Sequence, residues 1–233
     1  MRAGLACIFP ILFTVACSDG SNDALTPNGD ERLSVMNFAE DFSFDPLPPG
    51  WSHRKFWTRS AMKLSQVEKD ETRALRCETE DGGSIFGRAV DVPLDTYPTL
   101  VWDWYVEVPI DSPLDEKTRE GDDHPARFFI KFRDSEGGDH AIEIIWSNET
   151  FKPGDYKIIG DFYHYVANGL DENIGRWWHE EVDLRAIYRK ATGRTDAAST
   201  TQIAIFCDSD ETDTRSVAYF SDVALVKRTP KLR

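Results

Sequence analysis

Cysteines, basic residues and long hydrophobic runs are scarce in this sequence, and each shortage excludes a class of protein. Only four of the 233 residues are cysteines, and no two of them have the spacing of a metal site. Lys and Arg number 27 against 41 Asp and Glu, which gives a formal net charge of −14. Because binding to phosphate backbones requires clustered Lys and Arg, nucleic acid is an unfavourable partner. The acidic surface instead favours cations, neutral sugars and basic protein patches.

The main apolar stretch lies at the N-terminus, in residues 1–16. Its roughly 13 apolar residues are fewer than the roughly 20 that span a bilayer core, and the pattern is typical of a secretory signal. The following Cys17, between Ala16 and Ser18, resembles the lipobox of bacterial lipoproteins, although Thr14 stands where Leu is usual. The resemblance implies a lipid anchor on Cys17 at the outer membrane of a Gram-negative cell. An ordinary signal cut near Ala16 would instead give a secreted or periplasmic protein.

The segment after the signal is polar and has no apolar periodicity. Residues 17–33 therefore predict a flexible tether between the lipidated cysteine and a folded domain over residues 34–233. Apart from the signal and the lipidated cysteine, Cys77 and Cys207 are the cysteines that are left. Each has a strand-like context, so the sequence is consistent with a disulfide between them or with two separate buried thiols.

Short runs with strand character fill the domain and alternate with turn-rich pieces such as EDGG, DSEGG and KPGD. One helix is predicted, with Asp183 as N-cap, LRAIYRKAT as its body and Gly193 at its C-terminal end. Many strands with almost no intervening helices predict an all-β fold, an antiparallel β-sandwich or jelly roll. The predicted strands are Asn37–Phe44, Ala61–Glu68, Ala74–Thr79, Ser84–Val90, Leu100–Val108, Ala126–Arg133, Ala141–Ser147, Tyr156–Val166, Arg176–Val182, Gln202–Cys207 and Val217–Val226.

Alternation within three of these strands separates a core face from a mixed polar face. The first face carries large apolar side chains, among them Trp102, Trp104 and Trp146. If the three strands are neighbours in one sheet, the second face is a charged, aromatic surface that suits a ligand. A solvated outer face with cross-strand ion pairs is the alternative. The candidate binding residues on this face are Asp103, Tyr105, Arg127 and Glu143.

The densest polar segment covers residues 116–127, and it contains Asp122 and Asp123 side by side. Adjacent side chains diverge in an extended segment, so this pair is a poor match for an acid and a base that face one bond. We expect one of the two carboxylates to pair with Arg127 or to cap the turn.

A second acidic loop covers residues 208–214. Its Asp208 and Asp210, at alternate positions, offer hard oxygen ligands that suit Ca²⁺. The loop lacks the glycine and the distant glutamate of an EF-hand, and a solvated loop between two strands is the alternative.

The two ends of the domain resemble the first and last strands of galactose-binding-like jelly rolls. The matching segments are FAEDF at residues 38–42 and YFSDV at residues 219–223. In that group these strands commonly meet at a structural calcium ion. The resemblance implies Glu40 and Asp222 as calcium ligands.

Four motifs follow one another along the chain: W-x-W at Trp102, GDD-x-x-A-R from Gly121, W-S-N from Trp146 and D-x-D-x-T from Asp208. Together they resemble the bacterial family called domain of unknown function 3047, over about residues 42–226. That family has D-Y-R in its helix and then F-G, where this chain has I-Y-R and T-G. The resemblance implies an extracytoplasmic β-sandwich, often lipid-anchored. It implies no activity, because the family has none assigned.

Two functions from different classes fit these features. The first is a non-catalytic module that binds carbohydrate or cell-envelope glycan on the mixed polar face. The second is a carboxylate-dependent glycan hydrolase or lyase, which needs the two acidic loops to meet in one cleft with Arg127 as charge stabiliser. An envelope scaffold that binds proteins is a further alternative.

Overall fold

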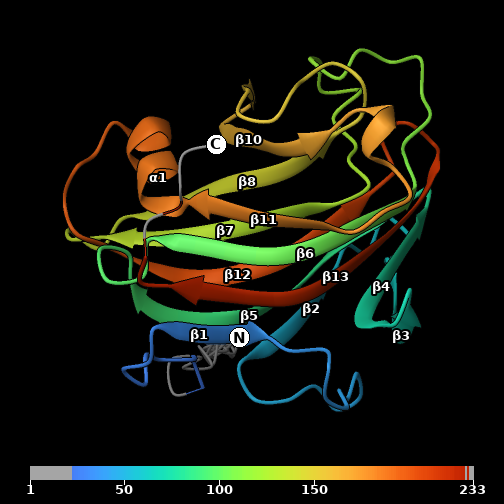
Figure 1. The fold of residues 1–233 in the computed structure, drawn as a ribbon. Helices are drawn as coiled ribbons and strands as arrows, with labels where there is room; N and C mark the ends of the chain where they lie inside the picture. The colour runs from blue at the N-terminus through green and yellow to red at the C-terminus, as the bar shows by residue number, and fades with distance from the viewer. Residues whose placement is uncertain (1–22, 229, 231–233) are drawn as a thin grey trace, which may run out of the picture.

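The chain folds into two β-sheets that pack face to face, with one α-helix beside them (Figure 1). The computed structural model describes residues 23–228 and residue 230, so the predicted signal and Cys17 lie outside the described residues. One sheet has six strands in the order β11-β6-β13-β4-β3, with β1 also paired to β13. These strands are β1 (Arg32–Met36), β3 (Lys63–Lys69), β4 (Thr72–Glu80), β6 (Thr99–Val108), β11 (Trp178–Asp183) and β13 (Arg215–Val226).

The other sheet has seven strands in the order β2-β5-β12-β7-β8-β10-β9. The β8–β10 pair is parallel, and the other pairs in both sheets are antiparallel. The predicted β-sandwich of the jelly-roll kind with one short helix is therefore confirmed. The strands are β2 (Trp51–Lys55), β5 (Gly83–Pro93), β7 (Arg127–Asp134), β8 (Asp139–Ser147), β9 (Tyr156–Ile159), β10 (Phe162–Gly169) and β12 (Ala198–Asp208).

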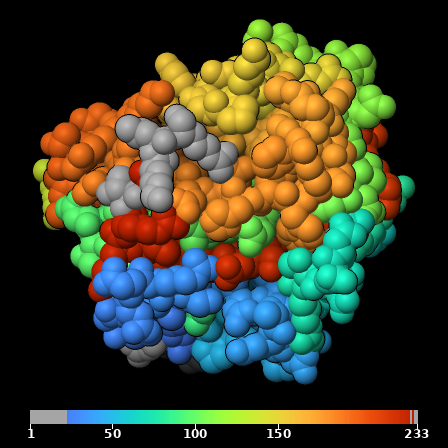
Figure 2. All heavy atoms as spheres, in the orientation of Figure 1, coloured from blue at the N-terminus to red at the C-terminus, as the bar shows by residue number. Residues whose placement is uncertain are grey.

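The six-stranded sheet faces the viewer in Figure 1, and Figure 2 shows the same side as a surface. There β13 (red) crosses between the N-terminal segment (blue) and the chain around α1 (Leu184–Thr192) and β11 (orange). The outer side of the seven-stranded sheet points away from this view. The sandwich thus has two outer faces, and each belongs to a different sheet.

The predicted core face is confirmed. Trp102, Trp104 and Trp146 are at most 1% exposed and lie between the sheets. The Trp102 and Trp104 rings meet edge to face at 5.1 Å, and the Trp104 ring lies 5.4 Å from that of Trp146. Since each buried aromatic ring removes roughly 150–250 Å² from water, this cluster is a large share of what holds the sheets together.

The strand predicted at Asn37–Phe44 is wrong. The first strand lies earlier, at β1, and Leu25 also hydrogen-bonds through its backbone to Ala89 and Asp91 of β5. Part of the segment predicted as a tether therefore lies against the sandwich. Residues 37–44 are irregular because the Gln66 side chain replaces a strand partner there, donating to backbone oxygens and accepting from a backbone N–H.

The strand predicted at Tyr156–Val166 is two strands, β9 and β10. Gly160 has φ +58°, a left-handed conformation that lets the chain reverse between them. The predicted helix is confirmed as α1 (Leu184–Thr192). The Asp183 carboxylate caps it by accepting the Ala186 N–H at 2.8 Å, and Gly193 ends it with φ +71°.

The structure has Cys77 and Cys207 as free, buried thiols, so it contains no disulfide between them. Cys77 Sγ lies 3.3 Å from Met62 Sδ in the core. Burial and the neighbouring Cys77 raise the pKa of the Cys207 thiol well above its usual value, which keeps it protonated. Among the described residues, no helix is long and apolar enough to span a membrane.

Candidate functional site

Buried charges gather on the outer face of the seven-stranded sheet. Strand alternation turns Arg127 and Phe129 of β7 away from the core, and Glu143 of β8 is paired with both Phe129 and His164 of β10. His164 is in turn opposite Lys157 of β9. The residues of four neighbouring strands therefore place acidic and basic groups side by side on one face.

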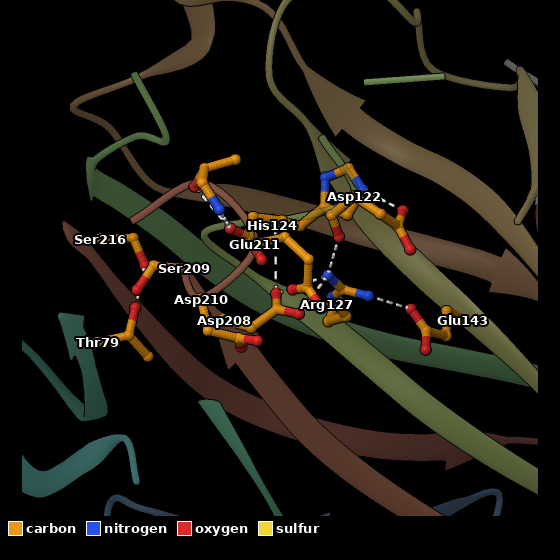
Figure 3. Close-up of polar contacts among 12 residues, drawn as sticks. Thr79, Asp122, His124, Arg127, Glu143, Asp208, Ser209, Asp210, Glu211 and Ser216 are labelled. Carbon is orange, nitrogen blue, oxygen red and sulfur yellow. Dashed lines mark hydrogen bonds and ion pairs between the residues drawn. The ribbon is translucent and has the colours of Figure 1, made fainter. Parts of the chain in front are cut away.

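Arg127 is the centre of this arrangement (Figure 3). Its guanidinium donates to Glu143 at 2.6 Å and to both oxygens of Asp208 at 2.6 and 2.7 Å, and it lies 4.6 Å from the centre of the Phe206 ring. It also donates to the backbone oxygen of Asp122 at 2.5 Å. Arg127 is only 2% exposed, so Glu143 and Asp208 both pair with a cation that is removed from water. Arg127 thus contacts the GDD segment through the backbone carbonyl of Asp122, whereas the sequence predicted a pairing with the carboxylate of Asp122 or Asp123.

The Asp122 carboxylate turns towards β9 and β10. It lies 2.6 Å from Lys157 Nζ, 3.4 Å from His164 Nε2 and 3.5 Å from His124 Nε2. Burial opposes its charge, yet the two nearby histidines and the charge of Arg127 bring its pKa well below the ordinary value. Burial and the charge of Lys157 lower the pKa of His124 to about 4, so this imidazole is neutral at pH 7.

Asp122 and Asp123 diverge as predicted. Asp123 turns to the opposite side, where its Oδ2 accepts the backbone N–H of Thr212 at 2.7 Å and the Thr212 hydroxyl at 2.6 Å. The GDD segment and the loop after β12 therefore meet. Carboxylate oxygens of Asp123, Asp208, Asp210 and Glu211 all lie within 4.8 Å of one another, and we call these four residues the acidic cluster.

Two carboxyl groups of the acidic cluster have raised pKa values. Burial raises the pKa of Asp208 to about 8 despite the opposing charge of Arg127, and nearby Asp123 adds to the rise. Burial raises the pKa of Glu211 to about 8, and the negative charges of the nearby Asp208 and Asp123 add to the rise. Of the residues that sequence reasoning placed in this region, Asp122, Asp123, Arg127, Glu143, Asp208 and Asp210 all lie in or beside the network.

Asp103 and Tyr105 do not belong to this site. Their strand, β6, lies in the six-stranded sheet, so the expected single mixed face is divided between the two outer faces. Asp103 Oδ1 lies 2.8 Å from Nδ1 of His179 on β11. Tyr105 packs against the rings of Tyr219 and Trp177, each at 5.7 Å.

The calcium ligands implied at the ends of the domain are not members of the acidic cluster. Glu40 is exposed, and Asp222 forms a surface ion pair with Arg32 at 2.6 Å. The structure instead brings together Asp208 and Asp210, the residues whose alternate spacing suggested a cation, with two further carboxylates.

Sequence reasoning missed several residues of the network, among them Glu116, Lys157 and Glu211. Glu116 is 4% exposed and accepts the backbone N–H groups of Asn148, Glu149 and Thr150. Lys157 donates to the Glu116 backbone oxygen at 2.7 Å. The only sequence signal for Lys157 was the alternation of side chains before and after Gly160. These two stretches were predicted as one strand, so Lys157 was not recognised.

A row of four phenylalanine rings crosses the same outer face, and we call it the aromatic row. Phe56 lies 6.3 Å from Phe206, and Phe129 lies 6.0 Å from Phe162, which is 40% exposed. With Ile85 and Ala204, three of these rings form a hydrophobic cluster separate from the main core. Basic groups flank the row, since Arg54 lies over Phe56 and Lys131 over Phe129.

A hollow of about 640 Å³ lies near this face. Arg133, which is two residues beyond Lys131 on β7, contributes to its wall, together with Asp91 of β5 and Thr201 of β12. The outer face of the seven-stranded sheet therefore combines apolar rings, charged groups and a concave surface, the usual elements of a ligand site.

The family model for "Protein of unknown function (DUF3047)" matches residues 49–224. This chain belongs to that family. The matched region contains the whole acidic cluster and the whole aromatic row. No curated protein matches the sequence.

Several solved structures are similar to the family member described here. The family 11 carbohydrate-binding module of the cellulase Lic26A-Cel5E of Clostridium thermocellum has 9% identity and a TM-score of 0.46, with 86% of this chain and 98% of that chain covered. The xyloglucanase domain of NopAA from Sinorhizobium fredii has 12% identity and a TM-score of 0.44, covering 80% and 96%. The CBM22-1 xylan-binding domain of Xyn10C from Paenibacillus barcinonensis has 12% identity and a TM-score of 0.35, covering 85% and 94%.

Proposed function

We propose that this protein is a non-catalytic module that binds a glycan on the outer face of the seven-stranded sheet. The aromatic row carries the proposal. Apolar rings on the outside of a sheet need a reason, because single exposed apolar residues are ordinary but a contiguous cluster marks an interaction site. Here the exposed ring of Phe162 continues a cluster that already reaches Phe56 at the other edge of the sheet.

A sugar suits this face better than a purely apolar ligand. A pyranose ring has an apolar C–H side, which packs on an aromatic ring, and hydroxyl groups around its edge, which need hydrogen-bond partners. Lys131, Gln202 and Arg133 supply such partners between the aromatic row and the hollow. A chain of sugar units along the face would meet both kinds of group.

Binding without cleavage is favoured by the arrangement of the carboxylates. Glycosidases place two carboxyl groups about 5–9.5 Å apart on either side of the bond that they cleave. The oxygens of the acidic cluster lie within 4.8 Å of one another, and Asp123 and Asp208 are at most 3% exposed. Arg127, the expected charge stabiliser, is buried between Glu143 and Asp208 and is not available to a substrate.

Affinity electrophoresis in gels that contain neutral or uronate-containing polysaccharides tests the proposal. We expect at least one polysaccharide to retard the protein, and Phe162→Ala and Phe206→Ala each to weaken binding about fivefold, because one stacked ring contributes about 1 kcal/mol. Trp177→Ala is the matched control, since it removes an aromatic ring from the other outer face. Retardation by none of the polysaccharides, or an equal loss in Trp177→Ala, would contradict the proposal. Release of reducing ends would favour the hydrolase instead.

We further propose that the module is held at the cell envelope by a lipid on Cys17. The support is the N-terminal sequence, with its short apolar signal and its lipobox-like cleavage region. If the proposal is right, Cys17→Ser will move the protein from the membrane fraction to the soluble fraction. Unchanged membrane association would contradict it.

A further inference from the structure

The acidic cluster lies beside the aromatic row but is not part of the proposed glycan site. Asp123 comes from the loop between β6 and β7, while Asp208 ends β12 and Asp210 and Glu211 follow it. Two segments that are about 85 residues apart in sequence therefore contribute oxygens to one small volume. Carboxylate oxygens gathered in this way are hard ligands, which Ca²⁺ and related divalent cations prefer.

A second observation concerns Asp123 alone. Its side chain is fully buried, and Oδ2 is fixed by two hydrogen bonds from Thr212. Its Oδ1 is also buried and has no hydrogen-bond partner among the described residues. A buried carboxylate oxygen without a donor is costly, and a cation bound to this oxygen would remove that cost.

The positive charges around the cluster do not supply that partner. Arg127 binds Asp208 through both oxygens, but it divides its charge between Asp208 and Glu143. Arg59 forms an ion pair with Asp210 and lies 3.5 Å from Glu211, and its side chain is 40% exposed. Neither arginine contacts Asp123 in the described structure.

Arg59 also lies at the entrance to the cluster. Together with Asp210, Asp81 and the fully exposed Trp57, it lines a hollow of about 560 Å³. A cation arriving from solvent through this hollow would reach Asp210 first. The exposed Arg59 side chain can rotate into water, whereas Arg127 cannot, because it is buried.

We propose that the acidic cluster binds a hard divalent cation of the Ca²⁺ type through Asp123, Asp208, Asp210 and Glu211, and that Arg59 competes with it. The ion would join the β6–β7 loop to the end of β12. Ca²⁺ accepts several carboxylates in an irregular shell, whereas Mg²⁺ demands near-octahedral geometry and retains water. The site therefore favours Ca²⁺ over Mg²⁺.

Calorimetric titration of the chelator-treated full-length protein with CaCl₂ tests this proposal, with thermal unfolding as a second measurement. We expect heat of binding and a rise in Tm of several degrees, because a ligand that binds only the folded state stabilises it. Asp210→Asn and Glu211→Gln should each weaken Ca²⁺ binding at least tenfold. These residues are less buried than Asp123 and Asp208, so the variants are the ones expected to fold, which circular dichroism can check.

Asp213→Asn is the matched control. Asp213 is exposed in the same loop with φ +52°, which asparagine tolerates, and it makes the same change of charge outside the cluster. It should bind Ca²⁺ as the wild type does, while Arg59→Gln should bind it several-fold more tightly. The proposal is overturned if Ca²⁺, Mg²⁺ and Mn²⁺ produce neither heat nor a Tm shift at millimolar concentration, or if Asp213→Asn loses as much affinity as Asp210→Asn. Tighter binding of Mg²⁺ than of Ca²⁺ would overturn the assignment to Ca²⁺.

Discussion

The two outer faces of the sandwich both carry aromatic clusters, but they differ in how completely their polar groups are paired. On the six-stranded sheet, the Tyr219 hydroxyl donates to Glu107 at 2.9 Å, and Glu107 also accepts from Lys69 at 3.0 Å. Lys69 Nζ lies 4.6 Å from the centre of the Tyr105 ring, and its backbone oxygen accepts from Trp177 Nε1. This cluster is complete in itself.

On the seven-stranded sheet the corresponding face of the described structure has an exposed ring and an unpaired polar atom. The Phe162 ring remains exposed at one edge, and Oδ1 of Asp123 lacks a partner among the described residues. Unpaired buried polar atoms are rare in folded proteins and often mark a place where an ion or ligand belongs. The comparison teaches that aromatic content alone does not distinguish the two outer faces, whereas incomplete pairing does.

The largest expected difference between the faces comes from removing the central cation of each. Arg127→Met leaves Asp208 and Glu143 buried without their shared partner, and breaking such a pair costs about 3–5 kcal/mol. Lys69→Met removes an ion pair whose side chains are 23% and 38% exposed, for which about 1 kcal/mol is expected. Chemical denaturation measures both losses. Similar losses for the two variants would mean that removing the cation of the buried network costs no more stability than removing the cation of the surface pair.

A second prediction concerns the pH dependence of the buried pair. Burial raises the pKa of Glu143, but the charge of Arg127 and the hydrogen bond from His164 outweigh it and lower the pKa from 4.5 to about 2. The carboxylate of the folded state therefore contributes stability above about pH 4.5, and this contribution is lost as the pH falls towards 2. We expect Glu143→Gln to cost about 3 kcal/mol at pH 7, since one unit of pKa shift corresponds to about 1.4 kcal/mol.

The free energy of unfolding of wild type and Glu143→Gln, measured from pH 7 down to pH 2.5, checks this sign. The difference between them should shrink steadily below pH 4.5. Glu107→Gln on the other outer face is the comparison, because Glu107 is exposed and its loss should be smaller at every pH. A difference for Glu143→Gln that grows as the pH falls would contradict the assignment of Arg127 as the cause.

Periodicity within strands was sufficient to predict the sandwich and the tryptophan core, and the signals at its two ends were sufficient to predict the capped helix. It did not reveal which strands are neighbours, because alternation defines the two faces of one strand and says nothing about the sheet to which it belongs. Asp103 and Tyr105 were therefore grouped with Arg127 and Glu143, although β6 lies in the other sheet.

The acidic loops were recognised from their composition, and their meeting was stated only as a condition of the hydrolase hypothesis. The contact depends on Thr212, whose N–H and hydroxyl hold Asp123, and on the His124 N–H, which donates to Asp208 at 3.2 Å. Contacts of this kind join distant segments and leave no local pattern. The aromatic row was missed for the same reason, because three of its rings come from different strands and Phe56 follows the end of β2.

The smallest expected effects come from two tyrosine hydroxyls, one in each sheet. Tyr219→Phe removes the hydrogen bond to Glu107 and should cost about 1 kcal/mol, while the ring packing with Tyr105 is retained. The buried Tyr163 hydroxyl of β10 has no hydrogen-bond partner among the described residues, so Tyr163→Phe should leave stability unchanged or raise it slightly. Thermal unfolding of both variants at one pH measures the contrast. A larger loss of stability in Tyr163→Phe than in Tyr219→Phe would mean that the Tyr163 hydroxyl has a hydrogen-bond partner. It would contradict the view that polar groups in the seven-stranded sheet are less completely paired than those in the six-stranded sheet.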